Sequence, residues 1–536
     1  MTHQHSTSGL VGTFILATLG GCVNNWPAYR HDRERSGNQR AASVLSNPSR
    51  VGTLAVRWSW SPPSPGGFKA SPVVDKGKVY IGNGNGYFYA LNAATGALLW
   101  QFPAAGAPAL TSAYTCNPSS FGIASSAAMA TIKVKWVWFL KRSVRLVIFA
   151  APDRSLPPGN GSGRLFALNA NNGAVVWTSP ALAQVSGTTP GSTAQLHEQL
   201  GYSAPVVSDK RVFVGVANHC DNPIQNGKVV AVDLQTGGLV STFNYTSTSS
   251  RGGGVWSSPA ADGSGLYITT GNTRCWGGGC QPEPTPNHGL SMIRLDAGSG
   301  ALIWKLQPVP FALDDDPDWA TGATLMRTSC GNLAASVMKD GWAYAVDRGS
   351  GTPGAPSVRW QFPGGGIPFP SIPGVTHGDT HYKKAGAAWG DVLFVETGGY
   401  ARLVSGASSG YGKLHALNAC APAAQRVRWI LDVPGASTWG YGLGAPAVTG
   451  GIVYVGTSQG HVIAIADPSV APAAGIRCAN TNYTVALCAG AGYNTVPIPA
   501  VLANVNVGGS MWNEPALAEG KVFVATDAGA VHMLAP

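Results

Sequence analysis

Short runs of alternating apolar and polar residues recur along the whole chain, and each run ends in a polar turn. In residues 86–100, apolar positions alternate up to Leu91, an Asn-x-x-Thr-Gly sequence follows, and a second run ends at Trp100. An alternation with a period of two predicts β-strands with one buried face. The short polar side chain and the glycine predict a tight turn between two such strands. We therefore predict a hairpin here.

The same hairpin recurs eight times, and a second pair of predicted strands precedes each copy. The copies are GYFYALNAATGALLW (86–100), GRLFALNANNGAVVW (163–177), GKVVAVDLQTGGLVS (from 227), SMIRLDAGSGALIW (291–304), GWAYAVDRGSG (from 341), GKLHALNACAPAAQRVRW (412–429), GHVIAIADPS (from 460) and GAVHMLAP (from 529). The preceding piece is clearest in ASPVVDKGKVYIG (70–82) and GAPAVTGGIVYVG (444–456). Each unit therefore has four predicted strands, and most units end in a Trp-bearing one.

A closed ring of these units is the fold that the repeats favour. One four-stranded unit cannot bury both of its faces alone, whereas a ring of units can, with the Trp of each unit packed on its neighbour. The last unit stops at Pro536 without a Trp strand, and TLAVRWSW (53–60) can supply it. We predict an all-β fold: an eight-bladed β-propeller of four-stranded antiparallel blades over residues 51–536, after a lead-in at 23–50. An open β-solenoid is the alternative.

Composition agrees with this fold and narrows the function. The chain has 71 Gly, 38 Pro and 17 Trp, with 11% charged and 44% hydrophobic residues. This composition is typical of a folded, turn-rich β-protein and not of a disordered chain. The net charge is +10, but Lys and Arg are scattered and no nucleic-acid-binding motif is present. We expect no nucleic-acid partner, while an anionic small ligand or membrane surface remains open.

The first 22 residues have the features of an export signal. The apolar run at 10–19 has the length of a signal-peptide core and is too short to span a membrane. It ends in Leu19-Gly20-Gly21-Cys22, which resembles a bacterial lipobox, where Cys22 would be acylated. The first nine residues contain no Lys or Arg, so plain secretion or a retained segment stay open. We expect a cell-envelope protein, periplasmic or extracellular, with a lipid anchor if Cys22 is modified.

Eight further cysteines favour disulfide bonds outside the cytoplasm. They are Cys116, Cys220, Cys275, Cys280, Cys330, Cys420, Cys478 and Cys488. Cys275 with Cys280, and Cys478 with Cys488, are close enough in sequence to close single loops. No CxxC or CxxCH motif occurs, which argues against a zinc ribbon and a c-type haem.

The repeats and the stretch NNWPAYRHDRERSGN (24–38) resemble those of the PQQ-repeat family, the tryptophan-docking propellers of quinoproteins. The resemblance covers roughly residues 50–536 and implies the propeller fold. It leaves the function open between two classes. Such blades occur in PQQ-dependent alcohol dehydrogenases and also in lipoprotein scaffolds of outer-membrane protein assembly that bind no cofactor.

The resemblance implies a quinone site built from the middle blades. RGGGVWSSPAADGSGLYITTGNTRCW (251–276) resembles the family stretch that runs from the ring-stacking Trp to a Ca²⁺-binding Asn, which implies Trp256 and Asn272 in these roles. DDDPDWATGATL (314–325) resembles the segment with the catalytic Asp, implying Asp318 as general base and metal ligand. MKDGWAYAVDR (338–348) implies that Lys339 contacts the quinone oxygens. Without a quinone, these residues would be packing, turn or surface positions.

Three positions depart from the dehydrogenase pattern. No Glu stands near residues 215–222, where the family has a Ca²⁺ ligand, and Asp221 is the nearest substitute. The adjacent Cys pair of many members is absent, with Cys116 alone. Lys69 stands where the dehydrogenases often have Glu or Gln, and it could bind a PQQ carboxylate instead.

One segment fits the repeat poorly. KVKWVWFLKRSVRLVIFA (133–150) has five positive charges and no negative ones, too many for a membrane span. We predict two strands of an enlarged second blade. A strip that docks on a membrane surface or a partner is the alternative.

Three functions follow as hypotheses. The first is an exported quinoprotein that oxidises an alcohol-type substrate with PQQ and Ca²⁺ and passes electrons to an external acceptor, a cytochrome or a quinone. The second is a non-catalytic envelope propeller, a ligand-binding module or a scaffold whose partners are outer-membrane assembly or other envelope proteins. The third is a carbohydrate-binding propeller that uses Trp-rich loops.

Overall fold

The computed structural model describes residues 24–41, 43–64, 66–113, 120–137, 140–153, 162–183, 198, 200, 202–218, 226–244, 252–272, 288–308, 318–319, 321–339, 342–349, 354–362, 385–397, 413–433, 443–479 and 494–536.

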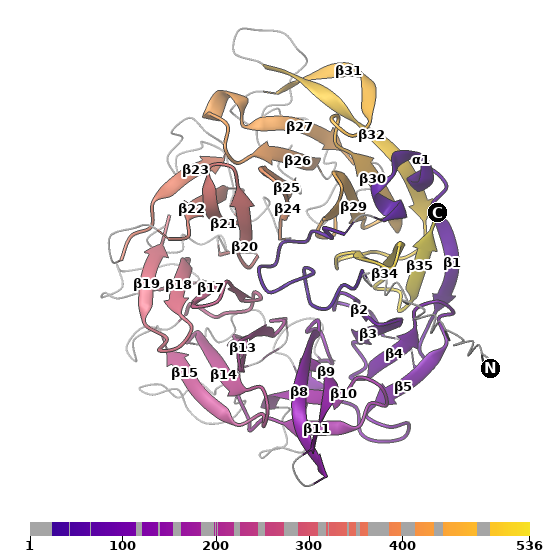
Figure 1. Cartoon of the computed structure of the whole chain (residues 1–536), viewed down its shortest axis with the longest axis vertical. Helices are drawn as coiled ribbons and strands as arrows, with labels where there is room; N and C mark the ends of the chain where they lie inside the picture. The colour runs from indigo at the N-terminus through magenta and orange to yellow at the C-terminus, as the bar shows by residue number, and fades with distance from the viewer. Residues whose placement is uncertain are drawn as a thin grey trace, which may run out of the picture.

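Within these residues the chain forms a ring of eight antiparallel sheets, the blades of a propeller (Figure 1). Blades 1 to 4 consist of β2 (Val73–Asp75), β3 (Lys78–Gly82), β4 (Phe88–Asn92) and β5 (Leu98–Phe102); β8 (Ala128–Val137), β9 (Leu140–Asp153), β10 (Ser162–Asn169) and β11 (Val175–Thr178); β12 (Val206–Ser208), β13 (Arg211–Val216), β14 (Lys228–Asp233) and β15 (Leu239–Asn244); and β16 (Ala260–Ala261), β17 (Gly265–Thr269), β18 (Met292–Asp296) and β19 (Leu302–Leu306). A small pair, β6 (Ser112–Ala113) and β7 (Ser120–Phe121), lies between blades 1 and 2 in sequence.

Blades 5 and 6 repeat this pattern, blade 7 has a fifth strand, and blade 8 takes its last strand from the N-terminal part of the chain. Blades 5 to 8 consist of β20 (Thr324–Thr328), β21 (Gly331–Val337), β22 (Ala343–Asp347) and β23 (Val358–Phe362); β24 (Ala387–Trp389), β25 (Val392–Thr397), β26 (Lys413–Asn418) and β27 (Val427–Asp432); β28 (Ala447–Thr449), β29 (Ile452–Gly456), β30 (His461–Ala466), β31 (Pro472–Ala479) and β32 (Asn494–Asn506); and β33 (Ala516–Ala518), β34 (Lys521–Ala525), β35 (Val531–Ala535) and β1 (Ala55–Trp60). Helical residues are few among those described: η1 (Val44–Ser46), α1 (Pro48–Val51) and η4 (Ala423–Gln425).

The two ends of the chain close the ring. β1 pairs with β35 in an antiparallel ladder that runs from Ala55–Ala535 to Trp60–Val531, and the two strands lie side by side in Figure 1. The prediction that residues 53–60 complete the last blade is confirmed, and so is the eight-bladed fold. Because β1 supplies the outer strand of blade 8, the N-terminal and C-terminal parts of the chain complete the same blade and close the ring.

Tryptophans dock most blades on the next, and Phe243 takes this place between blades 3 and 4. Trp58 of blade 8 donates its indole N–H to the carbonyl of Ala93 in blade 1, 3.3 Å away. Gly96 of the same turn has φ +73°, and a Cβ there would lie 2.8 Å from the Trp58 ring. Trp100 and Gly173 repeat this contact between blades 1 and 2. The turn glycine of the repeat is thus required twice, for its backbone conformation and for the close approach of the ring.

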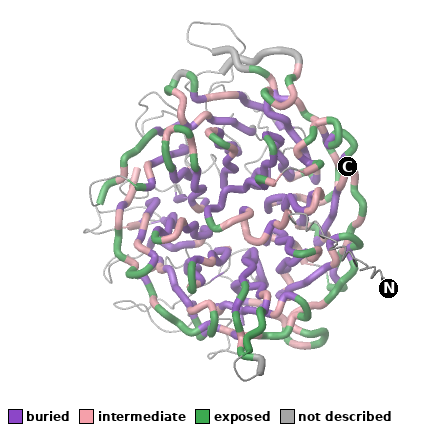
Figure 2. Tube along the Cα trace, viewed as in Figure 1, coloured by how far each residue is buried: buried purple, intermediate pink, exposed green. Residues whose placement is uncertain are grey.

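The lead-in segment (residues 24–40) crosses the centre of the ring and contacts all eight blades (Figure 1). Its hydrogen-bond partners, from blade 1 to blade 8, are Val74, Ala127, Ala204, Ala261, Leu325, Ala388, Val448 and Leu517. Figure 2 shows the surrounding inner strands as largely buried, with exposed residues toward the rim. The lead-in therefore acts as a central tie between blades that are otherwise linked only to their neighbours.

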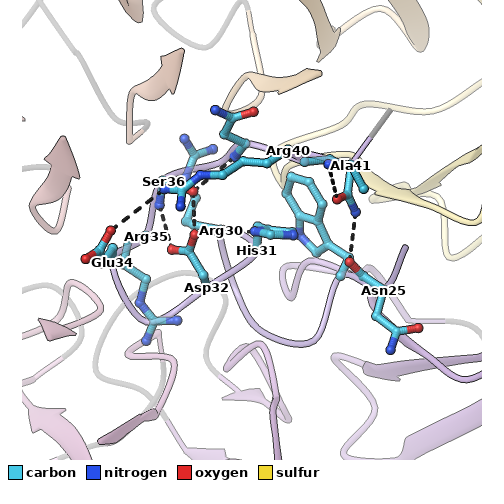
Figure 3. Close-up of polar contacts among 12 residues, drawn as sticks. Asn25, Arg30, His31, Asp32, Glu34, Arg35, Ser36, Arg40 and Ala41 are labelled. Atoms are coloured by element: carbon cyan, nitrogen blue, oxygen red, sulfur yellow. Dashed lines mark hydrogen bonds and ion pairs between the residues drawn. The ribbon is translucent and has the colours of Figure 1, made fainter. Parts of the chain in front are cut away.

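Two arginines anchor this tie. Arg30 is fully buried and donates to the Pro446 carbonyl at 2.6 Å, to the Gly386 carbonyl, and to Glu514 at 2.8 Å. Arg35, also buried, donates to the carbonyls of Pro259, Ala204 and Pro205. Figure 3 shows that the charged side chains of this segment point outward in several directions. Each guanidinium thus bonds blades that lie far along the chain from the lead-in segment itself.

The two ends of the ring axis carry different loops. In an antiparallel blade the first strand starts, and the second strand ends, at the same end of the axis. We call that end face A; it holds the residues before each first strand and the turns between second and third strands. Face B holds the turns between first and second strands. Residues that occupy equivalent positions in different blades therefore meet on one face.

Blade 2 has an enlarged first hairpin, as predicted for residues 133–150. β8 and β9 pair from Ala128–Ile148 to Val137–Leu140, whereas the first hairpin of blade 1 ends after three pairs. No helix in the described part of the chain is both long and apolar enough to cross a membrane.

One disulfide links neighbouring blades. Cys330, in the β20–β21 turn, is bonded to Cys420, which follows β26. Sequence spacing did not indicate this pair, since the two residues are 90 positions apart. The side chains of Cys275, Cys280, Cys478 and Cys488 lie outside the described residues.

Candidate functional site

A cavity of about 280 Å³ lies at the ring axis on face A. Its lining combines four aromatic rings, a cation, a carboxylate and five hydroxyls: Tyr29, Tyr202, Trp256, Trp512, Lys69, Glu514, Ser71, Ser126, Ser257, Ser258 and Thr321. Aromatic walls with a few placed polar groups are typical of small-molecule sites. We call this cavity the axial pocket.

The pocket wall is built from one repeated position. In five blades, the residue four places before the first ladder pair lines the pocket: Lys69, Ala124, Tyr202, Trp256 and Trp512 precede the pairs Val73–Tyr80, Ala128–Ile148, Val206–Phe213, Ala260–Tyr267 and Ala516–Phe523. The repeat turns this position toward the axis in these five blades, and its side chains supply part of the wall. Two of the eight blades place Trp there.

Trp256, Asp318 and Lys339 form a contact group beside the pocket. The indole N–H of Trp256 donates to Asp318 Oδ2 at 2.7 Å. Lys339 Nζ lies 2.6 Å from Asp318 Oδ1 and 5.3 Å from the centre of the Trp256 ring. The carboxylate thus accepts a hydrogen bond from the indole and forms an ion pair with the ammonium, which also makes a cation–π contact with the Trp256 ring.

Local structure fixes this group at the junction of blades 4 and 5. Trp256 precedes β16, Asp318 precedes β20, and Lys339 follows β21. The buried Trp319 forms an isolated bridge with Met338, and the Lys339 N–H donates to the Asp318 carbonyl at 3.0 Å. These bonds hold the acidic and the basic side chain next to each other on face A.

Asn272 lies close to this group but not in the pocket wall. It is 2% exposed, and its carbonyl accepts from Gly253 at 2.7 Å. A Cβ at the preceding Gly271 would lie 3.4 Å from Asp318 Oδ2. Gly271, the residue before Asn272, therefore lies next to the Asp318 carboxylate.

The described residues contain no evident metal site, and several of the positions predicted from the sequence lie outside them. Within the described residues, no group of three or more His, Cys, Asp and Glu side chains could hold a metal ion. Asp221, Cys22 and Cys116 lie outside these residues, as do Asp314, Asp315 and Asp316.

Lys69 belongs to a second group of the same kind. Its Nζ lies 3.0 Å from Asp527 Oδ2 and 4.6 Å from the centre of the Trp512 ring. Lys69 and Asp527 are each about one-quarter exposed, so the pair is accessible to a ligand. Two Trp–Lys–Asp groups therefore flank the axial pocket, one from blades 4 and 5 and one from blades 8 and 1.

Burial keeps the pocket phenols protonated. Desolvation, helped by the charge of Glu514, raises the pKa of Tyr29 to about 12. Desolvation and the charge of Asp527 raise the pKa of Tyr202 to about 12. Burial also raises the pKa of the Glu514 carboxyl, against the opposing charge of Arg30. Both phenols can thus donate hydrogen bonds at neutral pH.

Sequence reasoning missed Trp512, Asp527 and Tyr202. Trp512 had a usable signal, because WNEPA (512–516) repeats WSSPA (256–260) at the start of a blade. Asp527 had none, since it lies 458 residues from its partner Lys69 and only ring closure brings them together.

A protein-family model for the β-propeller domain of glucose, ethanol and alcohol dehydrogenases, named PQQ, matches residues 26–371. The dehydrogenase subunit of a quinone-type alcohol dehydrogenase from Gluconacetobacter polyoxogenes is 24% identical over 371 residues, 61% of this chain and 44% of that protein. The chain thus spans less than half of that relative's length. The outer membrane protein assembly factor BamB of Alkalilimnicola ehrlichii is 26% identical over 183 residues, 31% of this chain and 47% of that protein.

Solved structures share the fold at low identity. A europium-containing methanol dehydrogenase superposes with a TM-score of 0.63 at 15% identity, covering 96% of this chain and 98% of that one. At this identity the likeness speaks for the fold alone.

Proposed function

The chain belongs to the PQQ family of glucose, ethanol and alcohol dehydrogenase β-propeller domains, and from this premise we propose that it binds PQQ in the axial pocket and oxidises an alcohol-type small molecule. In this proposal the electrons leave to an external acceptor, a cytochrome or a quinone. The observation that carries the proposal is the Trp256–Asp318–Lys339 group at the rim of an aromatic pocket on the ring axis.

The pocket residues fit a flat, anionic quinone. Trp256 and Trp512 offer indole rings for stacking. Lys69 offers an ammonium for a carboxylate, and Tyr29, Tyr202 and the pocket hydroxyls offer further donors. When bound, PQQ would accept the hydride and the electrons, a role that no amino-acid side chain can take.

The fit to Ca²⁺ is incomplete in the described residues. Ca²⁺ takes six to eight oxygen ligands, whereas Asp318 and Asn272 are the candidate donors described on this side, and Asp318 already pairs with Lys339. Asp221 is the further candidate from the sequence. We therefore propose Asn272, Asp318 and Asp221 as candidate Ca²⁺ ligands.

Asp318 is the proposed general base. An alcohol gives up hydride readily only after its hydroxyl proton is removed, and a positioned carboxylate can accept that proton. Trp256 holds one carboxylate oxygen and Lys339 the other, so the base has a fixed orientation. Lys339 also lies over the Trp256 ring, where its positive charge would stabilise negative charge that grows on a stacked ligand.

Reconstitution tests this assignment. The chain is incubated with PQQ and Ca²⁺, and dye-linked oxidation of a panel of alcohols is measured. We expect Asp318→Asn still to bind PQQ but to lose about 10²–10⁴-fold in turnover. Full activity of Asp318→Asn would contradict the role of this residue. The matched control is Asp296→Asn, which changes a half-buried turn carboxylate at the end of β18 in blade 4 and should leave turnover intact, because other copies of the repeat have Asn at this position.

A second function has one observation in its favour, the match to BamB over 183 residues. A non-catalytic propeller of this kind would bind outer-membrane assembly or other envelope proteins through its faces. Failure of the wild-type chain to bind PQQ, together with co-purification of envelope proteins, would favour this scaffold function.

We also propose that Cys22 is acylated and that the mature protein resides in the cell envelope. Cys22→Ser should then release the protein from membranes or leave residues 1–21 attached. Unprocessed protein that stays in the cytosol in both forms would contradict this.

A further inference from the structure

The enlarged hairpin of blade 2, residues 131–145, carries an exposed basic surface on face B. In other blades the turn between first and second strands follows at once, as after Asp75–Lys78 in blade 1. Here the ladder continues from Thr131–Arg145 to Val137–Leu140. One side of the extension packs inward, with Ile132 and Val144 in the hydrophobic core between blades 2 and 3. The other side faces solvent.

Four cations on this extension are exposed: Lys133, Lys135, Lys141 and Arg142. Lys135 and Lys141 are direct cross-strand partners, an arrangement that is destabilising because like charges oppose each other. Residues 131–145 contain no Asp or Glu, so the hairpin itself offers no compensating charge. An external anionic surface would relieve this repulsion.

The hairpin also exposes apolar surface next to its charges. The side chain of Leu140, at the end of the ladder, is 48% exposed. An exposed apolar side chain flanked by Lys and Arg is a combination that favours the interface of an anionic bilayer.

The N-terminus of the described chain lies on the same face. The Asn24 carbonyl accepts from Glu519 in the β33–β34 turn at 2.9 Å. The Asn25 side chain bonds to Asp75 and Lys76 at the β2–β3 turn. Both turns join first and second strands and therefore belong to face B. Cys22, the proposed lipid attachment site, is two residues before Asn24, so an acyl chain there would hold face B toward the bilayer.

We propose that the hairpin of residues 131–145 docks on an anionic lipid surface. Its cations meet the lipid phosphates, and face B lies against the membrane. The axial pocket opens on the other end of the ring axis, so docking leaves the pocket facing the aqueous phase. This interaction does not depend on PQQ, and it persists whether the protein is an enzyme or a scaffold.

Vesicle co-sedimentation tests the proposal with the chain from residue 23 onward, which contains every described element and carries no lipid. The probes are vesicles of phosphatidylcholine alone and vesicles that also contain phosphatidylglycerol. We expect binding to the anionic vesicles, little binding to the neutral ones, and loss of binding in high salt. Because one cation near such a surface contributes about fivefold, Lys135→Gln should weaken binding about fivefold and Lys135→Gln/Lys141→Gln about 25-fold.

The control is Arg57→Gln, which removes the same charge from exposed β1 at the rim of blade 8. It should keep nearly all of the binding, and thermal unfolding should show that all variants are folded. An equal loss of vesicle binding in Arg57→Gln would show that only the net charge of the protein matters, and this would overturn the proposal. Absence of vesicle binding, with photo-crosslinking from position 140 to an envelope protein in cells, would also overturn it and identify a protein as the partner.

Discussion

Trp256 and Trp512 occupy the same position of the blade repeat, in blades 4 and 8, and both line the axial pocket. In a ring of eight, these two blades face each other across the axis. Each indole has an ammonium over its ring, that of Lys339 at 5.3 Å and that of Lys69 at 4.6 Å. The two sides differ in their polar bonds, because Trp256 donates to Asp318. We therefore expect Trp256 to affect both PQQ binding and turnover, and Trp512 to affect PQQ binding only.

Substitution of the two tryptophans should therefore have different effects. Trp256→Leu and Trp512→Leu should each weaken PQQ binding about tenfold through loss of an aromatic contact. Only Trp256→Leu should also lower turnover at saturating PQQ, because it removes the bond that orients Asp318. Binding is followed by fluorescence and turnover by dye reduction. Equal turnover losses in both variants would contradict the division of roles.

Lys69 and Asp527 should have opposite effects on affinity. Lys69→Gln removes a charged partner for a carboxylate and should weaken PQQ binding about 10–100-fold. Asp527→Asn frees the ammonium from its present partner and removes a negative charge from the rim, so it should strengthen binding. Equilibrium titration of both variants measures this. A weaker affinity in Asp527→Asn would mean that the carboxylate positions Lys69 and does not compete with the ligand.

Much of the fold was predictable because it is repeated. Eight copies of one hairpin, the docking tryptophans and the missing last strand all follow from periodicity. The candidate site was only partly predictable. Trp256, Asp318 and Lys339 lie in blades that are adjacent in sequence, but Lys69 meets Trp512 and Asp527 only through closure of the ring.

The lead-in was the least predictable element. Its bonds go mainly to backbone carbonyls and amides of the first strands, which no side-chain pattern marks. Arg30 and Arg35 appear in the sequence as ordinary charged residues, yet both are fully buried by the eight blades around them.

Removal of Arg30 should destabilise the whole ring. Arg30→Ala leaves Glu514 buried without its ion-pair partner, a loss that typically costs about 3–5 kcal/mol. Arg30→Lys should not rescue stability, since an ammonium cannot reproduce the guanidinium bonds to three blades. Thermal unfolding checks both variants. The double variant Arg30→Met/Glu514→Leu should recover much of the loss, because it removes the unpaired charge; wild-type stability in Arg30→Ala would refute the anchoring role.

Asp467 provides a pH-dependent link between blades 6 and 7. Burial raises its pKa, but hydrogen bonds from Arg428, Ser469 and Trp429 outweigh burial and lower the pKa below 3.8. A carboxyl whose pKa falls on folding stabilises the fold above its unfolded pKa, and this contribution is lost as the pH falls through the folded value. Asp467→Asn should therefore cost about 1–3 kcal/mol at neutral pH, because it weakens the hydrogen bonds from Arg428, which is one-third exposed. The stability difference from the wild type should begin to narrow near pH 4 and keep narrowing as the pH falls through the lowered pKa, and a pH-independent difference would argue against this link.

The central claim is that the axial pocket is a PQQ site, and equilibrium titration with PQQ in the presence of Ca²⁺ tests it most directly. Tryptophan fluorescence of the wild-type chain reports binding. We predict saturable quenching with one PQQ per chain, weakened in Trp256→Leu and Trp512→Leu and in Lys69→Gln. A wild-type chain whose fluorescence does not change with PQQ, with or without Ca²⁺, would contradict the claim and leave the propeller as a non-catalytic scaffold.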